Sequence, residues 1–143
     1  MAAKGSTFSN DFLKLILNAT PIPNIADNAA TAPLTSLYVA LHTADPTAAG
    51  NQTSNEVAYT GYARAAVVRT SSGWTVAANQ WNPTAVINFP ACTGGSATAT
   101  FASIGTALSG TGKILWSGAI SPSISIANGV TPQLTTASLG TES

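Results

Sequence analysis

The sequence predicts a mainly β protein: a jelly-roll-like antiparallel β-sandwich with one N-terminal α-helix. Three observations predict this fold class. Short runs after residue 36 alternate between apolar and polar side chains, which is the period of a half-buried strand. Turn signals rich in Gly, Pro and Asn separate these runs, at the spacing of roughly 8–12 residues that is typical of sandwiches and barrels. No helical pattern follows residue 20, although a parallel α/β fold would need one between its strands.

A single helix is predicted over residues 7–19. Its apolar side chains recur at i, i+4, i+7 and i+8, so they form one stripe along the helix. Pro21 and Pro23 end the helix, because proline cannot continue it. We expect the chain's own domain to cover the stripe, and a neighbouring subunit is the alternative. The stripe consists of Phe8, Phe12, Leu15 and Ile16, with Leu13 and Leu17 widening it.

The chain is expected to form two parts of unequal size. Residues 1–33 form the helix and a connector rich in Ala, Asn, Thr and Pro. Residues 34–143 form a single β-sandwich domain of about eight short strands. Separate strands are predicted over residues 113–120 and 123–126, and a turn is predicted at the Asn-Gly pair 128–129.

Charged side chains make up 7% of this chain, whereas roughly a quarter is typical of soluble proteins. A surface with so few charges is poorly protected against association, so it fits a protein that packs on other proteins. A secreted domain with a Ser/Thr surface is the plainer alternative. Five cations are too few for the many phosphate contacts of a nucleic-acid binder. No apolar run approaches the ~20 residues of a membrane span, and the N-terminus lacks the apolar core of a signal peptide. We therefore expect neither nucleic acid nor a membrane as a partner.

The sequence offers few groups for catalysis or metal binding. His42 is the sole histidine and lies at a predicted strand end. One interpretation makes it a general base oriented by Asp45 or Glu56, but a structural hydrogen bond to the adjacent loop is favoured. No Gly-x-Ser-x-Gly motif positions a serine nucleophile, and one histidine with one cysteine, Cys92, leaves a zinc site short of ligands. We predict no catalysis, no metal and no cofactor, and we expect Cys92 to be a small buried side chain.

Large aromatic side chains and arginines supply the candidate contact residues. Trp74 and Trp116 are assigned to the core. Arg64 and Arg69 are expected to pair either with carboxylates of a partner or with an internal carboxylate such as Asp45 or Glu56. The complete candidate interface is Phe8, Phe12, Leu15, Ile16, Tyr59, Tyr62, Arg64, Arg69 and Trp81.

One block of the sequence resembles a known group of proteins. It comprises residues 41–46 (LHTADP), 50–52 (GNQ) and 56–64 (EVAYTGYAR), and residues 101–105 and 114–118 extend the likeness. These segments resemble small virion proteins of tailed phages, whose members are often labelled tail or tail-fibre proteins. In size and composition the chain is also similar to the capsid cement (decoration) proteins of short-tailed Bordetella phages, which are jelly rolls. The resemblance implies a structural role in the virion.

Three functional hypotheses follow from the sequence and the resemblance. The leading one is a capsid cement protein on the capsid exterior, which binds across neighbouring subunits of the major capsid protein and associates with itself as a homodimer. The alternative is a tail-associated or host-attachment module in which Tyr59, Tyr62 and Trp81 face a glycan. The third is a small hydrolase that uses His42. The helix stripe and the loop over residues 43–61 are the expected contact surfaces.

Overall fold

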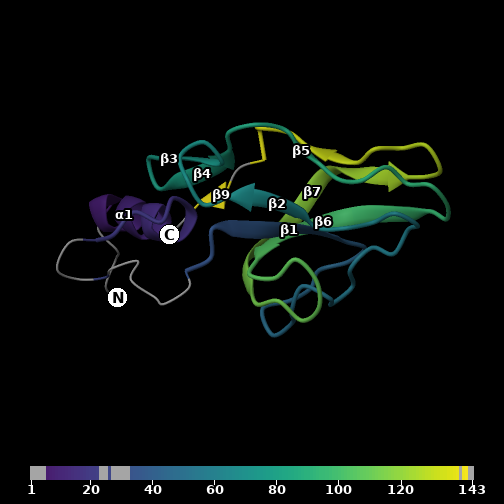
Figure 1. Ribbon diagram of the computed structural model, residues 1–143, viewed down its shortest axis with the longest axis horizontal. Helices are drawn as coiled ribbons and strands as arrows, with labels where there is room; N and C mark the ends of the chain where they lie inside the picture. Colours follow the sequence, from purple (N-terminus) through teal and green to yellow (C-terminus); the bar gives the residue numbers. More distant parts are fainter. Residues whose placement is uncertain (1–5, 23–25, 27–32, 139, 142–143) are drawn as a thin grey trace. The chain divides into compact units, whose positions relative to one another are not determined.

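The computed structural model describes residues 6–22, 26, 33–138 and 140–141 (Figure 1). The chain is mainly β, with antiparallel sheets and one helix, which is consistent with the predicted β-sandwich class. It divides into two compact units. The first contains Met1–Ser36, Val67–Ile87 and Leu134–Ser143, and the second contains Leu37–Ala66 and Asn88–Gln133. The predicted domain boundary at residue 33 and the jelly-roll connectivity stay predictions.

The helix of the first unit, α1 (Ser6–Leu17), buries a different line of side chains from the one expected. Leu13 and Leu17 are fully buried, whereas Phe8 is 43% exposed. Phe12, Leu15 and Ile16 are half-buried. The buried line is therefore displaced by one residue from the predicted stripe, because α1 packs against β3 and β4 through its Leu13 side. The expectation that this domain covers the helix is confirmed for Leu13 and Leu17.

Arg69 stabilises the C-terminal end of α1. Its guanidinium donates to the carbonyl oxygens of Ile16 at 2.7 Å, Leu15 at 2.9 Å and Leu34 at 2.7 Å. The carbonyls of Leu15 and Ile16 lie in the last turn of α1, where a helix leaves acceptors unpaired and where its dipole favours a cation. Ala19 follows in the left-handed conformation that commonly ends a helix. Arg69 was predicted to pair with a carboxylate, either of a partner or of this chain, and the structure shows that it makes these carbonyl contacts within its own unit.

The first unit also holds a small antiparallel sheet of β3 (Trp74–Ala77), β4 (Gln80–Pro83) and β9 (Gly140–Thr141). A two-residue turn with positive φ at both positions joins β3 to β4, as the twist of a hairpin favours. Trp74 is 1% exposed, as predicted for a core residue, and its ring meets that of Trp81 edge to face at 5.6 Å. A side chain at Gly140 would overlap the Trp81 indole. Trp81, a candidate contact residue, therefore packs largely within its own unit.

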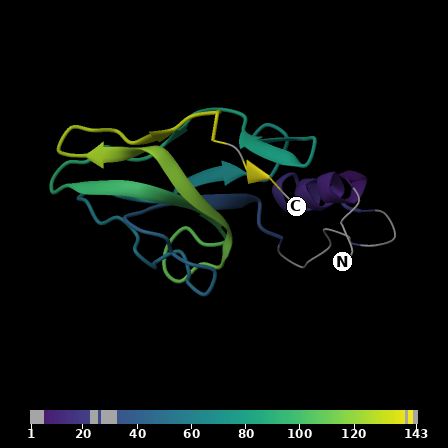
Figure 2. The same ribbon diagram turned by 180° about the vertical axis from the view of Figure 1, so that it is seen from behind.

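The main sheet contains four strands in the order β2-β1-β6-β7 (Figures 1 and 2). They are β1 (Ser36–His42), β2 (Ala65–Val68), β6 (Ala97–Gly105) and β7 (Ile114–Ile126). β1 and β7 each pair antiparallel with β6. The predicted strands at 113–120 and 123–126 are one strand, because a register shift between Ala99 and Phe101 lets β7 carry extra residues without ending.

The core of the second unit is built on both faces of β1. Leu37, Val39 and Leu41 are buried as predicted, but Ala40 and His42 on the opposite face are buried as well. The core also includes Phe89, Cys92, Ile104 and Ile126. The burial predicted for Cys92 is confirmed, whereas Trp116 is half-buried rather than a core residue. A two-stranded sheet of β5 (Ile87–Asn88) and β8 (Gln133–Leu134) completes the fold, and the predicted turn at 128–129 is present.

Candidate functional site

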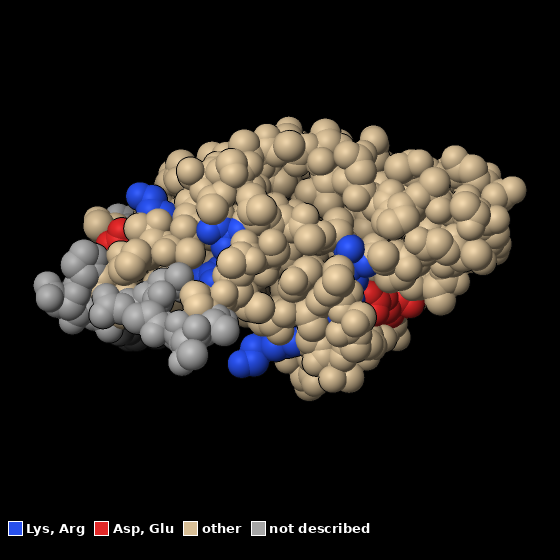
Figure 3. Space-filling view, viewed as in Figure 1, with Lys and Arg blue, Asp and Glu red and all other residues tan. Residues whose placement is uncertain are grey.

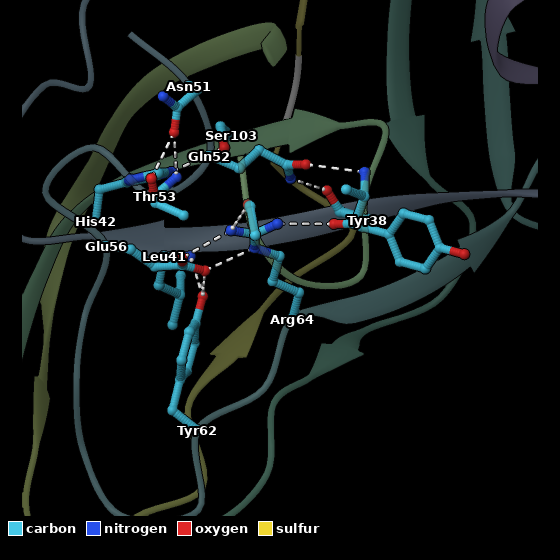
Figure 4. Close-up of polar contacts among 12 residues, drawn as sticks. Tyr38, Leu41, His42, Asn51, Gln52, Thr53, Glu56, Tyr62, Arg64 and Ser103 are labelled. Atoms are coloured by element: carbon cyan, nitrogen blue, oxygen red, sulfur yellow. Dashed lines mark hydrogen bonds and ion pairs between the residues drawn. The ribbon is translucent and has the colours of Figure 1, made fainter. Parts of the chain in front are cut away.

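The candidate site is a buried polar cluster beneath two loops of the second unit (Figure 4). We call the loops over residues 43–56 and 106–113 the paired loops. They lie side by side below the main sheet in Figures 1 and 2. The first loop follows β1, and the second joins β6 to β7. The buried polar cluster consists of His42, Gln52, Glu56, Tyr62 and Arg64.

A two-point ion pair forms the centre of the buried polar cluster. Arg64 Nε lies 2.7 Å from Glu56 Oε1, and Arg64 Nη2 lies 2.8 Å from Glu56 Oε2. Arg64 is 5% exposed, so the pair is shielded from water. Hydrogen bonding to the Glu56 carboxylate raises the pKa of Arg64. The internal pairing expected as one of two possibilities for Arg64 is confirmed, and the other possibility, a partner's carboxylate, is wrong for this buried side chain.

Arg64 uses its remaining donors to hold the second of the paired loops. Its Nη1 donates to the carbonyl oxygen of Ala107 at 2.9 Å, and its Nη2 donates to that of Gly110 at 2.8 Å. These acceptors lie 43 and 46 residues away along the chain. One buried side chain therefore fixes the shape of a distant loop.

Gln52 joins the two loops to each other and to the sheet. Its backbone N–H donates to Gly112 O at 2.9 Å, and its side-chain Oε1 accepts from Ala107 N at 3.1 Å. Its Nε2 donates to Tyr38 O in β1 at 2.8 Å. Gln52 is fully buried, and each polar atom of its amide has a protein partner. This role could not be predicted from the sequence, since a single glutamine in a polar loop has no distinguishing pattern.

The two tyrosines that were expected to contact a glycan form hydrogen bonds within the second unit. Tyr62 donates its hydroxyl hydrogen to Glu56 Oε1 at 2.9 Å and accepts from Leu41 N at 3.1 Å. Burial raises the pKa of the Tyr62 hydroxyl, so it stays protonated as a donor. Tyr59 is 5% exposed and donates to Pro90 O at 2.8 Å. The two rings meet edge to face at 5.3 Å. Tyr59 is therefore a core residue rather than the contact residue that was predicted, and Tyr62 is a half-buried member of the polar cluster.

His42 bridges the first loop and the sheet. Its Nδ1 lies 2.8 Å from Ser54 O, and its Nε2 lies 2.8 Å from Ser103 Oγ. Because a carbonyl oxygen only accepts, Nδ1 carries the proton and Nε2 accepts from the Ser103 hydroxyl. His42 has no exposed surface, and Ser103 is 2% exposed. The favoured interpretation, a strand-end histidine bonded to the adjacent loop, is confirmed. The two ring nitrogens are hydrogen-bonded to Ser54 O and Ser103 Oγ rather than to Asp45 or Glu56.

The burial of His42 predicts a stability that depends on pH. Burial lowers the pKa of His42 below its ordinary value of 6.5, and this effect outweighs the hydrogen bond to Ser54 O and the charge of Glu56, which act in the opposite direction. Below pH 6.5 the unfolded chain therefore binds a proton that the native state resists, and the free energy of unfolding should fall as the pH is lowered from 7 to 5. Urea unfolding at both pH values measures this. A His42→Gln variant should lose less stability over the same interval, and equal losses would contradict the assignment.

Two further properties bear on the chemistry of the described residues. Among the residues that the structure describes, no group of three or more His, Cys, Asp or Glu side chains lies close enough together to hold a metal ion. No helix in the described part of the chain has the length and apolar character to cross a membrane.

Comparison with known proteins identifies the class of this chain. A family model described as podophage GP4 fiber I protein gp80 matches residues 9–142. No curated protein matches the chain. The family match confirms the predicted class, a structural protein of a phage virion, and its description names a fiber protein rather than a capsid cement protein. Because the match spans nearly the whole chain, this protein belongs to the podophage GP4 fiber I protein gp80 family, a family of virion proteins of short-tailed phages.

Proposed function

We propose that this chain is a non-enzymatic contact module of the tail or tail fibres of a short-tailed phage. The observation that carries the proposal is the family match over residues 9–142, whose description names a fiber protein. This function was the alternative in the sequence analysis. The glycan-stacking form of that alternative receives no support from Tyr59, which is buried.

The surface and the paired loops support a role in protein contact. Figure 3 shows a face on which charged side chains are few and scattered among uncharged ones. The paired loops are held by hydrogen bonds from Gln52 and Arg64 before any partner arrives. A loop that is already ordered loses less conformational entropy on binding, so a modest contact area suffices. Virion assembly then multiplies such contacts by symmetry.

A capsid cement protein on the capsid exterior is the second candidate. The small size and low charge of the chain favour it, because a cement protein covers a shell through many weak contacts repeated by symmetry. Its partners would be neighbouring subunits of the major capsid protein and a second copy of this chain. Self-association as a homodimer would suit bridging between subunits.

Copy number and position in purified virions separate the two candidates. For the tail module we expect a copy number comparable with those of the other tail proteins, measured by quantitative gel, and antibody label at the tail in electron micrographs. A copy number comparable with that of the major capsid protein, with label over the head, would overturn the tail assignment in favour of cement. An antibody against the major capsid protein controls for access to the head.

A further inference from the structure

One feature of the paired loops is not explained by the stability of the fold. Leu108 lies in the second loop and is 55% exposed, the most exposed of the large apolar side chains in the described part of the chain. An isolated exposed leucine is ordinary on a protein surface. The support beneath this leucine is not ordinary, because the buried polar cluster fixes the backbone on both sides of it.

The backbone around Leu108 is held at three points. Ala107, immediately before it, donates its N–H to Gln52 Oε1 and accepts from Arg64 Nη1 through its carbonyl oxygen. Gly110, two residues after it, accepts from Arg64 Nη2. Gly112 accepts from the backbone N–H of Gln52 and packs so closely that a side chain there would overlap the Gln52 amide.

Stability alone is a poor explanation for this arrangement. Burying an arginine and a carboxylate removes both from water, and well-packed apolar residues of similar volume often serve stability as well or better. A buried ion pair does specify conformation, since removing either partner leaves a charge unpaired. Here the conformation that it specifies is that of a loop presenting Leu108.

We propose that Leu108 is the apolar anchor through which this chain docks onto another protein of the virion. The matching surface is a pocket sized for a leucine side chain. Carboxylates at its edge would face Lys113, which is exposed at the base of the same loop. In the described part of the chain, Lys113 forms no ion pair with a carboxylate of its own chain, so it is available to a carboxylate of the partner. The inference rests on the proposed role in the virion, because every copy of a virion component must be held there by a contact.

Incorporation into particles tests the anchor. A phage that lacks this gene is complemented with wild type, Leu108→Ala or Leu108→Asp, and the protein in purified virions is measured by quantitative gel. Loss of a desolvated anchor should reduce the incorporation of Leu108→Ala by about tenfold when the protein is limiting, and Leu108→Asp should be reduced further. The matched controls are Val86→Ala and Val86→Asp, because Val86 is a similarly exposed apolar residue at 44%. They should be incorporated like wild type.

The possible outcomes are distinct. Leu108→Ala and Leu108→Asp should unfold at the wild-type urea concentration, because the side chain is exposed. If Leu108→Asp unfolds at a lower concentration, the incorporation of Leu108→Ala alone tests the inference. Incorporation of Leu108→Ala at the wild-type level overturns the inference, even if the particles then adsorb poorly to cells, since the contact would lie with the host. Absence of the wild-type protein from virions would instead show that the proposed function itself is wrong.

Discussion

Replacing Glu56 with glutamine is expected to lower the free energy of unfolding by about 3 to 5 kcal/mol, as is typical when one partner of a buried ion pair is removed. Glutamine preserves the shape of the side chain but removes its charge. The Arg64 guanidinium, 5% exposed, would then stay buried without a compensating anion. The Tyr62 hydroxyl and Arg64 would also compete for one amide oxygen where they now share a carboxylate. Urea unfolding followed by tryptophan fluorescence measures the loss.

Asp45→Asn is the matched control for Glu56→Gln. Asp45 lies in the same loop and is exposed, and its Oδ1 accepts from Thr47 N at 2.8 Å, a contact that an asparagine preserves. This change should alter stability by less than about 0.5 kcal/mol. The double variant Glu56→Gln, Arg64→Met should be more stable than Glu56→Gln alone, because methionine removes the stranded charge. If Glu56→Gln unfolds at the wild-type urea concentration, the ion pair does not hold the loop as described.

The fold class could be predicted because its signal is local. Alternation over residues 37–41 and the Asn-Gly turn at 128–129 follow directly from strand and turn geometry. The orientation of α1 could not be predicted, since the pairs Phe12–Ile16 and Leu13–Leu17 have the same spacing and only contact with β3 and β4 selects between them. The continuity of β7 was also hidden. The extra residues of β7 interrupt its sequence pattern, so two strands were predicted. Only the pairing with β6 shows that the strand continues through them.

The candidate site was predictable only in part, for a similar reason. The pairing of Arg64 with Glu56 could be anticipated as one possibility, because the two residues are eight apart in sequence and the chain has few other carboxylates. The reach of Arg64 to Ala107 and Gly110 depends on tertiary structure that no local pattern encodes. Tyr59 was a candidate contact residue because it is a large aromatic side chain, yet it is buried and its ring packs against Tyr62. The sequence around an aromatic residue at the end of a loop does not distinguish a ring that packs in the core from one that faces solvent.

Gly105→Ala is expected to destabilise the protein by about 3 kcal/mol, even though the change adds a single methyl group. Gly105 closes β6 opposite Tyr38, and a Cβ at this position would overlap the side-chain amide of Gln52. Gln52 is fully buried, so its amide has no open space to enter. Displacing it would break the hydrogen bonds to Tyr38 O and Ala107 N and leave those groups unsatisfied.

Gly118→Ala provides the internal comparison. Gly118 lies in β7, in the same sheet, and a Cβ there would meet nothing within 4 Å. This variant should match the wild type or be more stable by up to about 1 kcal/mol, because alanine restricts the unfolded chain. Adding Gln52→Ala to Gly105→Ala should relieve the overlap and recover part of the loss, but the hydrogen bonds would stay broken. If the two glycine variants unfold at the same urea concentration, Gln52 does not lock the paired loops, and the fixed presentation of Leu108 loses its physical basis.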